Sequence, residues 1–407
     1  MISSYKNADT SILRLARIFS QAHIECGFIV PSQTALKKYT IDAIQPVRKL
    51  FEKNQFHDFR TQLQGKQNKV EKECWIVDGE KKSRSKISLY RPNTKAGDPR
   101  MWISMLHKLV SPNNVLALFF WNGSLHLVNC SKPDIEADLE DPNTILGTIR
   151  LQQAKKDPSN IVSEELLAKL KCIGSRGPIK SLRTGPTGIG FTLETLLGIA
   201  ANSDKRPDYK GIELKASRSI SPRGTNTPRE KISLFSKVPS RKLSPLTASE
   251  ALDLYGYYSE ENRQQLYCSV DAALRNSLGF ILDHSQEDDA LLAKNDKNQN
   301  SKDRDVFVWE LNTLREAFSK KHKETFWIGA KTEKKEDGEW FHYKNVRHTK
   351  HPSISVFEIC LLTGGICVDL TLSRLETGRV RDHGYLFRVK REAFSELFPE
   401  PKIYEIG

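Results

Sequence analysis

Long apolar runs are missing from this sequence, since no stretch of its 407 residues approaches the ~18 apolar residues that a membrane-spanning helix needs. The N-terminal segment MISSYKNADTSILRLARIF also lacks the apolar block and small-residue cleavage site of a signal peptide. Cysteine is sparse: seven residues, an odd number, lie at scattered positions without a CxxC pair. These absences argue against a membrane protein, a disulfide framework and a structural zinc site, and they predict a cytoplasmic protein.

Negatively charged residues are fewer than positively charged ones: the sequence has 50 Asp and Glu and 63 Lys and Arg, which gives a net charge of +13. A surplus of cations attracts polyanions, nucleic acid first and anionic membranes second. Many basic proteins bind neither, so the charge alone leaves the partner open. With 38% hydrophobic and 28% charged residues the composition is that of a globular protein, and the length suits two domains.

The first part of the chain predicts a smaller, β-rich α+β domain. An amphipathic helix pattern begins near residue 12, strand-like runs occupy residues 74–79 and 86–92, and residues 115–130 predict a hairpin that turns at Asn122-Gly123. An acidic stretch and a helical pattern follow. We therefore expect a first domain over residues 1–155, a linker over 156–172 and a second domain over 173–407.

The second domain predicts an α/β fold with helices flanking a mixed sheet. Strand patterns cover residues 207–217, 231–239 and 355–375, a helix pattern covers 309–322, and residues 324–346 predict a hairpin that turns at 336–338. The last segment, residues 384–398, predicts a strand and a helix. The polar run from Gln286 to Asp305 predicts a mobile surface loop.

The segment PDYKGIELKAS, residues 207–217, carries two acids and a lysine at short spacing. In a strand Glu213 and Lys215 point to the same face, and a turn at Gly211 can bring Asp208 beside Glu213. Two carboxylates that close repel each other unless a cation lies between them, and oxygen ligands suit Mg²⁺. A nearby lysine can orient a water or stabilise charge on a phosphoryl group. The pattern alone slightly favours a solvated hairpin over such a site.

Glu194 lies upstream in the short apolar helix pattern FTLETLLGIA, which begins at residue 191. An acid inside so apolar a helix is costly to bury without a partner. It therefore either approaches the same metal site or holds the lysine, or it lies at a helix edge in water.

The loop before this helix, RTGPTGIG, is basic and rich in glycine. It lacks the Lys-Ser/Thr pair of a nucleotide-binding loop, because Phe191 and Thr192 occupy those positions. Two interpretations stay open, a flexible basic turn and a loop that DNA approaches closely. In the second case the candidate phosphate contacts are Lys180, Arg183 and Arg218.

A basic cluster near the C-terminus spans SRLETGRVRDHGYLFRVKRE, residues 373–392. Arg binds guanine O6 and N7 with two hydrogen bonds in the major groove, and an acid can accept from cytosine N4. The turn at residues 382–384 can carry such groups into the groove, although a solvated basic face is the alternative. The candidates for base recognition are Arg379, Arg381, His383, Arg388 and Asp369.

The stretch GPTGIGFTLETLLGIAANSDKRPDYKGIELKAS resembles the MvaI/BcnI restriction endonucleases, relatives of the mismatch-repair nickase MutH in the PD-(D/E)xK nuclease superfamily. The resemblance covers residues 172–407 and is densest from Thr187 to Ser217, where a helix glutamate, Pro-Asp and E-L-K occur in order. It implies a PD-(D/E)xK nuclease core over residues 173–407, and RDHGYLFR resembles the segment that supplies base contacts. The implied catalytic residues are Glu194, Asp208, Glu213 and Lys215, with Asp208 and Glu213 as the ligands of Mg²⁺.

The resemblance further implies a Mg²⁺-dependent type II restriction endonuclease that hydrolyses double-stranded DNA at a short C/G-rich pseudopalindrome such as CCWGG or CCSGG. It implies a monomer in a prokaryotic cytoplasm, with a cognate methyltransferase in the same system that is not a binding partner. A MutH-like nicking repair endonuclease and a non-catalytic sequence-specific DNA-binding protein are the alternatives. The intact acids and lysine argue against the latter, and the extra first domain argues against MutH.

The first domain has a resemblance of its own. The segment SRSKISLYRPNTKAGDPRMWISML, with NVLALFFW, resembles the effector-binding domain of EcoRII-like enzymes, a β-pseudobarrel that binds a second DNA copy of the target. A structural or partner-binding module is the alternative. The candidate DNA contacts, interleaved with aromatic residues, are Arg84, Lys86, Arg91, Lys95 and Arg100.

Overall fold

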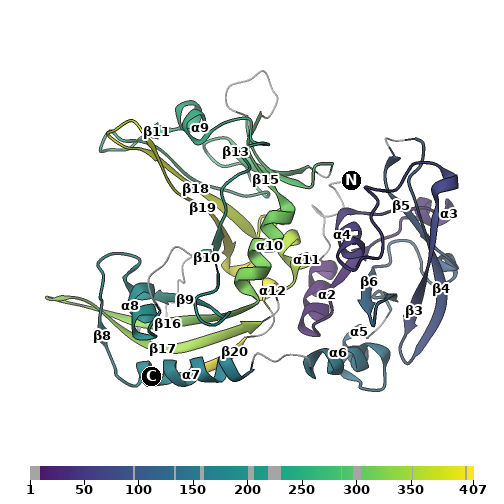
Figure 1. Cartoon of the computed structure of the whole chain (residues 1–407), viewed down its shortest axis with the longest axis horizontal. Helices are drawn as coiled ribbons and strands as arrows, with labels where there is room; N and C mark the ends of the chain where they lie inside the picture. The colour runs from purple at the N-terminus through teal and green to yellow at the C-terminus, as the bar shows by residue number, and fades with distance from the viewer. Residues whose placement is uncertain are drawn as a thin grey trace. The chain divides into compact units, whose positions relative to one another are not determined.

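A computed structural model of the chain describes residues 10–94, 97–132, 134–155, 160–199, 206–218, 231–285, 287–296, 304–350, 352–398 and 401–407. The chain divides into two compact units, Asp9–Asp157 and Pro158–Gly407 (Figure 1). No helix within these described ranges is long and apolar enough to cross a membrane.

The N-terminal unit is built on a seven-stranded sheet in the order β1-β6-β7-β3-β4-β5-β2, in which β3 and β7 pair in parallel and the other neighbours are antiparallel. The strands are β1 (Cys26–Ile29), β2 (Ile41–Asp42), β3 (Val70–Asp78), β4 (Lys81–Tyr90), β5 (Arg100–Ile103), β6 (Leu116–Trp121) and β7 (Ser124–Asn129). The helices are α2 (Thr10–Gln21), α3 (Gln33–Lys37), α4 (Gln45–Lys53), α5 (Ile135–Glu140) and α6 (Ile145–Lys155), with 3₁₀ turns at Lys66–Asn68 and Leu106–Lys108.

The local sequence accounts for these elements. Asn122 and Gly123 have φ angles of 48° and 75°, the left-handed pair that a two-residue hairpin turn needs, so the predicted β6–β7 hairpin is confirmed. In β4 the buried Ile87 and Leu89 alternate with polar neighbours, and both lie in the core beneath the sheet. The β-rich α+β prediction is confirmed for this unit, while the pseudobarrel stays a prediction.

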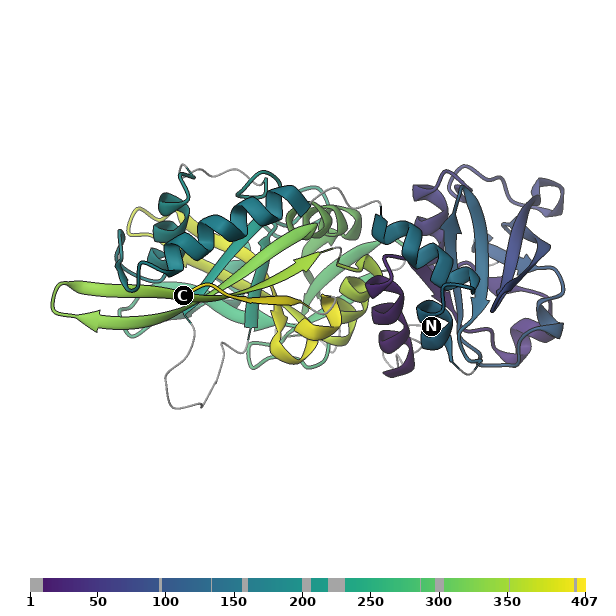
Figure 2. The ribbon, with the colours of Figure 1, turned by 90° about the horizontal axis from the view of Figure 1, so that it is seen from below.

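The described part of the C-terminal unit contains three sheets, in the orders β10-β19-β18-β12-β11, β13-β14-β15 and β20-β17-β16-β9, with β8 paired to β17. In the last sheet β9 and β16 are parallel, whereas β16 and β17 form a long antiparallel ribbon (Figure 2). Figure 1 shows α10 between the sheet that contains β10 and the sheet that contains β16. This mixed arrangement of strands and flanking helices confirms the predicted α/β class.

The strands of this unit are β8 (Ile179–Lys180), β9 (Glu213–Arg218), β10 (Lys231–Ser236), β11 (Tyr257–Tyr258), β12 (Gln264–Val270), β13 (Phe280–Ser285), β14 (Ala290–Asn295), β15 (Arg304–Glu310), β16 (Glu324–Lys335), β17 (Gly338–Lys350), β18 (Ile366–Arg374), β19 (Val380–Lys390) and β20 (Lys402–Glu405). The helices are α7 (Asn160–Gly174), α8 (Gly188–Leu196), α9 (Ala248–Tyr255), α10 (Leu311–His322), α11 (Ile354–Thr363) and α12 (Arg391–Leu397).

Most of the segment expected to be a linker, residues 156–172, falls in helix α7 of the C-terminal unit. Leu166, Leu170 and Ile173 of α7 are buried in the same core as Leu193 of α8 and Leu214 of β9. The helical pattern noted in the sequence thus belongs to the core that supports β9, and residues 156–159 lie outside the described residues.

Two predicted elements were wrong. The first part of residues 355–375 is helix α11, not a strand, with Ser353 capping its first turn and Gly364 ending it at φ 82°. Its apolar residues face all sides because the helix is buried, and a short apolar run without periodicity does not distinguish a helix from a strand. In the expected surface loop at 286–305, residues 290–295 instead form β14, whose alanines and leucines pair with β13 and β15, and residues 304–305 begin β15. Residue 286 and residues 297–303 of that segment lie outside the described residues.

Candidate active site

A tight turn brings Asp208 next to Glu213, as the spacing predicted. The backbone N–H groups of Tyr209 and Ile212 each donate to the other residue's carbonyl, at 2.9 and 2.8 Å. Between them Lys210 and Gly211 have φ angles of 45° and 94°, the paired left-handed conformation of a two-residue hairpin turn. The residues flanking this turn therefore lie opposite each other.

Side-chain contacts hold this turn in place from both sides. The Asp208 Oδ2 atom accepts a hydrogen bond from the backbone N–H of Leu214 at 2.9 Å. On α7, Glu165 accepts from the Tyr209 hydroxyl at 2.8 Å and from the Lys210 ammonium at 2.9 and 2.7 Å. The helix expected to be a linker therefore anchors the hairpin that carries both acids.

Glu213 begins β9 and is almost completely buried, with 1% of its side chain exposed. Its Oε1 atom accepts from Lys215 at 2.8 Å, and its Oε2 atom is buried without a hydrogen-bond partner among the described residues. Burial raises the pKa of this carboxyl group, the nearby Lys215 lowers it, and Asp208 raises it further. A buried carboxylate oxygen without a partner is costly, so this atom is placed to receive a ligand.

Glu194 approaches the same acids from helix α8. Burial raises its pKa, and the charges of Asp208 and Glu213 raise it further while Lys215 opposes them. Helix α8 begins at Gly188, where an added Cβ would lie 2.3 Å from the carbonyl oxygen of Arg183. The glycine-rich loop thus lets the chain turn tightly into α8, from which Glu194 is near enough to Asp208, Glu213 and Lys215 for their charges to shift its pKa.

The donor set suits a divalent cation that keeps part of its water shell. Among the described residues no three His, Cys, Asp or Glu side chains converge as a ready-made metal cluster. Asp208 and the unpartnered Oε2 of Glu213 are therefore the available ligands. Mg²⁺ is commonly bound by one or two carboxylates together with waters and substrate phosphates, so the residues present fit this ion.

Comparison with known proteins identifies the family of this fold and site. Residues 167–398, more than half of the chain, match the MvaI/BcnI restriction endonuclease family. The chain belongs to this family. Since its members are restriction endonucleases, the protein is a DNA nuclease by family, and the match includes every one of the four side chains described above.

Solved structures of MvaI are similar to the same part of the chain. One of them is titled "Restriction endonuclease MvaI-cognate DNA substrate complex". Its sequence is 20% identical to this chain, the match covers 60% of this chain and 98% of the MvaI chain, and the TM-score is 0.51. MvaI in the absence of DNA is 19% identical, with coverages of 62% and 100% and a TM-score of 0.35. No curated protein resembles the chain closely enough to count as a relative. The first likeness shows that the C-terminal unit has the MvaI fold.

The three cations expected to bind phosphate have partners within the unit. Arg218 donates to both oxygens of Glu339 at 2.8 Å and to the carbonyls of Gly185 and Pro186, so it ties the glycine-rich loop to β17. Lys180 pairs with Asp337 at 3.0 Å. Only Arg183, exposed and stacked 3.8 Å over the Phe191 ring, has no anionic partner in these contacts.

The residues expected to read bases fall into two groups on the β18–β19 hairpin. Arg379, Arg381 and His383 are exposed at its outer end. Asp369 and Arg388 instead pair with each other at 2.7 Å and are 13% and 25% exposed. The hairpin thus presents three exposed candidates, of which His383 lies 3.5 Å from the Ser373 hydroxyl and edge-on to the Tyr267 ring, and one salt bridge.

The N-terminal candidates also divide by exposure. Arg84 and Lys86 are exposed on β4, where Arg84 pairs with Glu73. Arg91 donates to the carbonyls of Gly97, Phe59 and Gln62, and Arg100 is 13% exposed and paired with Asp42. Both side chains therefore stabilise the fold and are not displayed on the surface. Lys95 lies outside the described residues.

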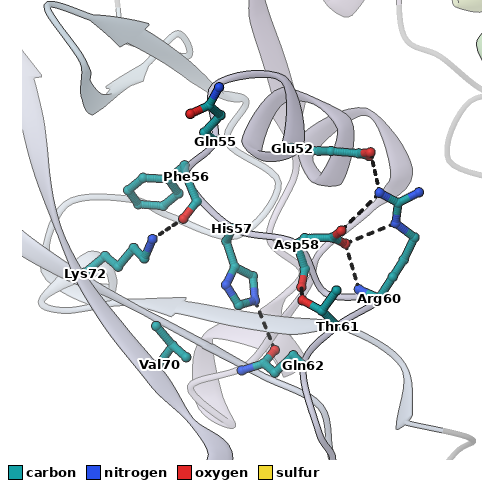
Figure 3. A pocket seen from close by; sticks show the side chains of 10 residues that line it. All are labelled: Glu52, Gln55, Phe56, His57, Asp58, Arg60, Thr61, Gln62, Val70 and Lys72. Atoms are coloured by element: carbon teal, nitrogen blue, oxygen red, sulfur yellow. Dashed lines mark hydrogen bonds and ion pairs between the residues drawn. The ribbon is translucent and has the colours of Figure 1, made fainter.

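A hollow of about 620 Å³ on the N-terminal unit was not anticipated from the sequence (Figure 3). His57 donates through Nε2 to Gln62 Oε1 at 3.1 Å, and burial lowers the pKa of His57. Arg60 binds Glu52 and, at 3.0 Å, Asp58, while Lys72 donates to a backbone carbonyl. The lining has two acids, Glu52 and Asp58, and two cations, Arg60 and Lys72, unlike the surplus of cations in a DNA-binding groove.

Sequence reasoning also missed Lys321 as a neighbour of the acids. Its ammonium lies 3.1 Å from Glu213 Oε1, although the two residues are far apart in the sequence. The only signal in the sequence was the amphipathic helix pattern over residues 309–322, which does not indicate the strand against which the helix packs.

Proposed function

We propose that the protein is a Mg²⁺-dependent type II restriction endonuclease that cuts both strands of DNA at a short C/G-rich pseudopalindrome, such as CCWGG or CCSGG. The observation that carries this proposal is the buried, unpartnered Oε2 of Glu213 beside Asp208, Glu194 and Lys215. We expect a monomer in a prokaryotic cytoplasm, accompanied by a methyltransferase that protects the same site.

In this proposal each side chain has its own task. Asp208 and Glu213 would hold the Mg²⁺ ion, which when bound activates water and stabilises negative charge on the phosphoryl oxygens. Lys215 would orient the attacking water and stabilise the charge that develops on the phosphate. Glu194, half-buried next to both ligands, would complete the acid cluster. The water oxygen becomes bonded to phosphorus as the 3′ oxygen leaves, which produces a 5′-phosphate and a 3′-hydroxyl.

Plasmid cleavage tests this proposal. Wild-type protein with plasmid DNA and Mg²⁺ should give discrete double-strand breaks whose sequenced ends share one short motif, and Lys215→Ala should abolish them. Nicks without double-strand breaks would favour a MutH-like nickase. Tight binding without cleavage would favour a non-catalytic DNA-binding protein.

We propose further that the N-terminal unit is an accessory DNA-binding module for a second copy of the target. Exposed Arg84 and Lys86 on β4 support this, as does Lys82 on the same strand, which lies 4.9 Å over the Trp75 ring. Short duplexes carrying the target should stimulate cleavage of a single-site plasmid by wild type, and Arg84→Ala with Lys86→Ala should remove the stimulation. A stimulation equal in both proteins would contradict this assignment.

A further inference from the structure

Lys321 lies at the C-terminal end of α10, next to Lys320. Successive residues of a helix point about 100° apart, so two neighbouring lysines cannot both face the same strand. The Lys320 side chain is 76% exposed and pairs with Glu316 on its own helix at 3.4 Å. The Lys321 side chain is only 21% exposed and turns inward to Glu213. The two lysines therefore have different roles.

Lys321 and Lys215 bind the same atom. The Nζ atoms of Lys215 and Lys321 lie 2.8 and 3.1 Å from Glu213 Oε1, one from β9 and the other from α10. Two cations on one oxygen compensate the charge of the buried carboxylate and leave the Oε2 atom available for another ligand. Only Lys215 belongs to the pattern that the family resemblance supplies.

The end of α10 is fixed against the active-site sheet. His322 donates through Nε2 to the Leu234 carbonyl at 3.0 Å, and its Nδ1 atom accepts from the Thr325 hydroxyl at 3.0 Å. Its ring stacks on Trp327 with an interplanar angle of 5°. Thr325 and Trp327 are the β16 residues in register with Glu213 and Lys215 on β9. These contacts set the position from which Lys321 reaches Glu213.

The middle of α10 is fixed as well. Arg315 is 8% exposed, donates to both oxygens of Asp289 at 2.7 and 2.9 Å, and also pairs with Glu358 of α11. Phe318 stacks on Phe357 of α11 with ring centroids 4.5 Å apart. A helix held by buried charge pairs and stacked rings presents Lys321 from a rigid base, which is the support that a precise site needs.

We propose that Lys321 is a positioning residue of the active site that holds Glu213 by its Oε1 atom. Resting on the proposed nuclease function, this assigns the two lysines separate tasks. Lys215, which is 29% exposed, turns from Glu213 toward the scissile phosphate when DNA binds. Lys321 stays on Oε1, so the buried carboxylate keeps a cation and its Oε2 atom stays directed at the metal position.

The first test compares Lys321→Met with Lys320→Met in single-turnover cleavage of a plasmid that the wild-type protein cuts. Loss of a residue that orients a metal ligand reduces activity by about 10–100-fold, so we expect that loss for Lys321→Met, with DNA affinity in Ca²⁺ unchanged. The matched control Lys320→Met should cut at the wild-type rate. Lys321→Arg should recover part of the activity, since it restores a cation.

The second test needs no catalysis and uses metal-free protein. Thermal unfolding is compared for wild type, Lys321→Met, Glu213→Gln and the double variant. We expect Lys321→Met to lower the unfolding temperature by about 2–4 °C when Glu213 is present, and by less than half of that when it is added to the Glu213→Gln variant. Equal shifts in the two backgrounds would mean that Lys321 does not hold Glu213.

The outcomes separate this inference from the proposed function. If Lys321→Met cuts as fast as wild type while Lys215→Ala is inactive, the nuclease assignment stands and the role of Lys321 is refuted. If wild type cuts no DNA, the nuclease assignment fails and the inference about catalysis fails with it, while the unfolding cycle still reports whether Lys321 holds Glu213.

Discussion

Two carboxylates in the C-terminal unit, Glu213 and Asp369, are both bound by cations, yet their oxygens are used differently. Asp369 accepts from Ser269 at 2.5 Å on Oδ1, with Lys231 at 3.5 Å, and from Arg388 at 2.7 Å on Oδ2. Glu213 has both of its lysines on Oε1 and no partner for the buried Oε2 among the described residues. A half-buried acid such as Asp369 whose two oxygens are both paired supports structure, whereas a buried acid with an unpartnered oxygen marks a place for a ligand.

The largest effect should come from Glu213→Gln. The amide keeps the shape of the side chain but cannot replace a carboxylate as a metal ligand, and a metal ion contributes several kcal/mol to such a reaction. We therefore expect the single-turnover cleavage rate to fall by about 10³-fold. DNA binding measured in Ca²⁺ should change little. A variant that still cuts within tenfold of wild type would remove Glu213 from the site.

Glu194→Gln should have a smaller effect on the same rate. Glu194 lies next to the two proposed ligands on α8 but takes no part in the pairing of Glu213 with the lysines. Loss of such a supporting charge costs about 10–100-fold in activity. Cleavage over a series of Mg²⁺ concentrations is the measurement. A loss as large as that of Glu213→Gln would make Glu194 a ligand, and no loss would place it at a solvated helix edge.

Asp369→Asn sharpens the comparison through stability. Removing the acid leaves Arg388 and Lys231 without their anion, which costs about 1–3 kcal/mol for a hydrogen-bonded charge. Metal-free Glu213→Gln should lose less stability than Asp369→Asn, because burial raises the pKa of Glu213 and makes its charged form costly in the folded protein. Chemical denaturation of the two variants measures both values. The opposite ranking would contradict the distinction between the two acids.

The smallest effect concerns a third carboxylate, Glu324, which accepts from His348 at 2.7 Å and from Ser163. Burial alone would raise its pKa, but the hydrogen bonds from His348 and Ser163 hold the pKa below the ordinary value of 4.5. Because the folded pKa is depressed, Glu324 contributes stability above pH 4.5 and loses it as the pH falls through the folded value.

Glu324→Gln should therefore be less stable than wild type at pH 7 by about 1 kcal/mol and should converge with it on acidification. Denaturation curves between pH 7 and pH 3 make this measurement. A difference that stays constant with pH would show that the ionisation of Glu324 contributes nothing.

The sequence predicted the hairpin of the active site because each of its parts is local. Gly211 permits the turn, and the alternation of side chains along a strand places Glu213 and Lys215 on one face. The length of the turn then places Asp208 opposite Glu213. The same local rules predicted the turn at Asn122-Gly123. They failed for α11, whose buried apolar residues show no periodicity, and for β14, whose strand character emerges only through pairing with β13 and β15.

The contacts of charged residues were not predictable in the same way. Nothing local distinguishes Arg91, which binds three backbone carbonyls, from Arg84, which stays exposed on β4. Lys321 reaches Glu213 only because α10 packs against β16, and that packing depends on contacts between distant segments. Sequence patterns therefore located the acids, while the tertiary structure was needed to find the second lysine beside them.

The most direct test of this account is the position of a bound metal ion. Crystals of the protein soaked in Mn²⁺ would locate the ion by its anomalous scattering. The account predicts an ion in contact with Oε2 of Glu213 and with Asp208, and none at Asp369. An ion bound at Asp369, or a site at Glu213 that stays empty at saturating Mn²⁺, would contradict it.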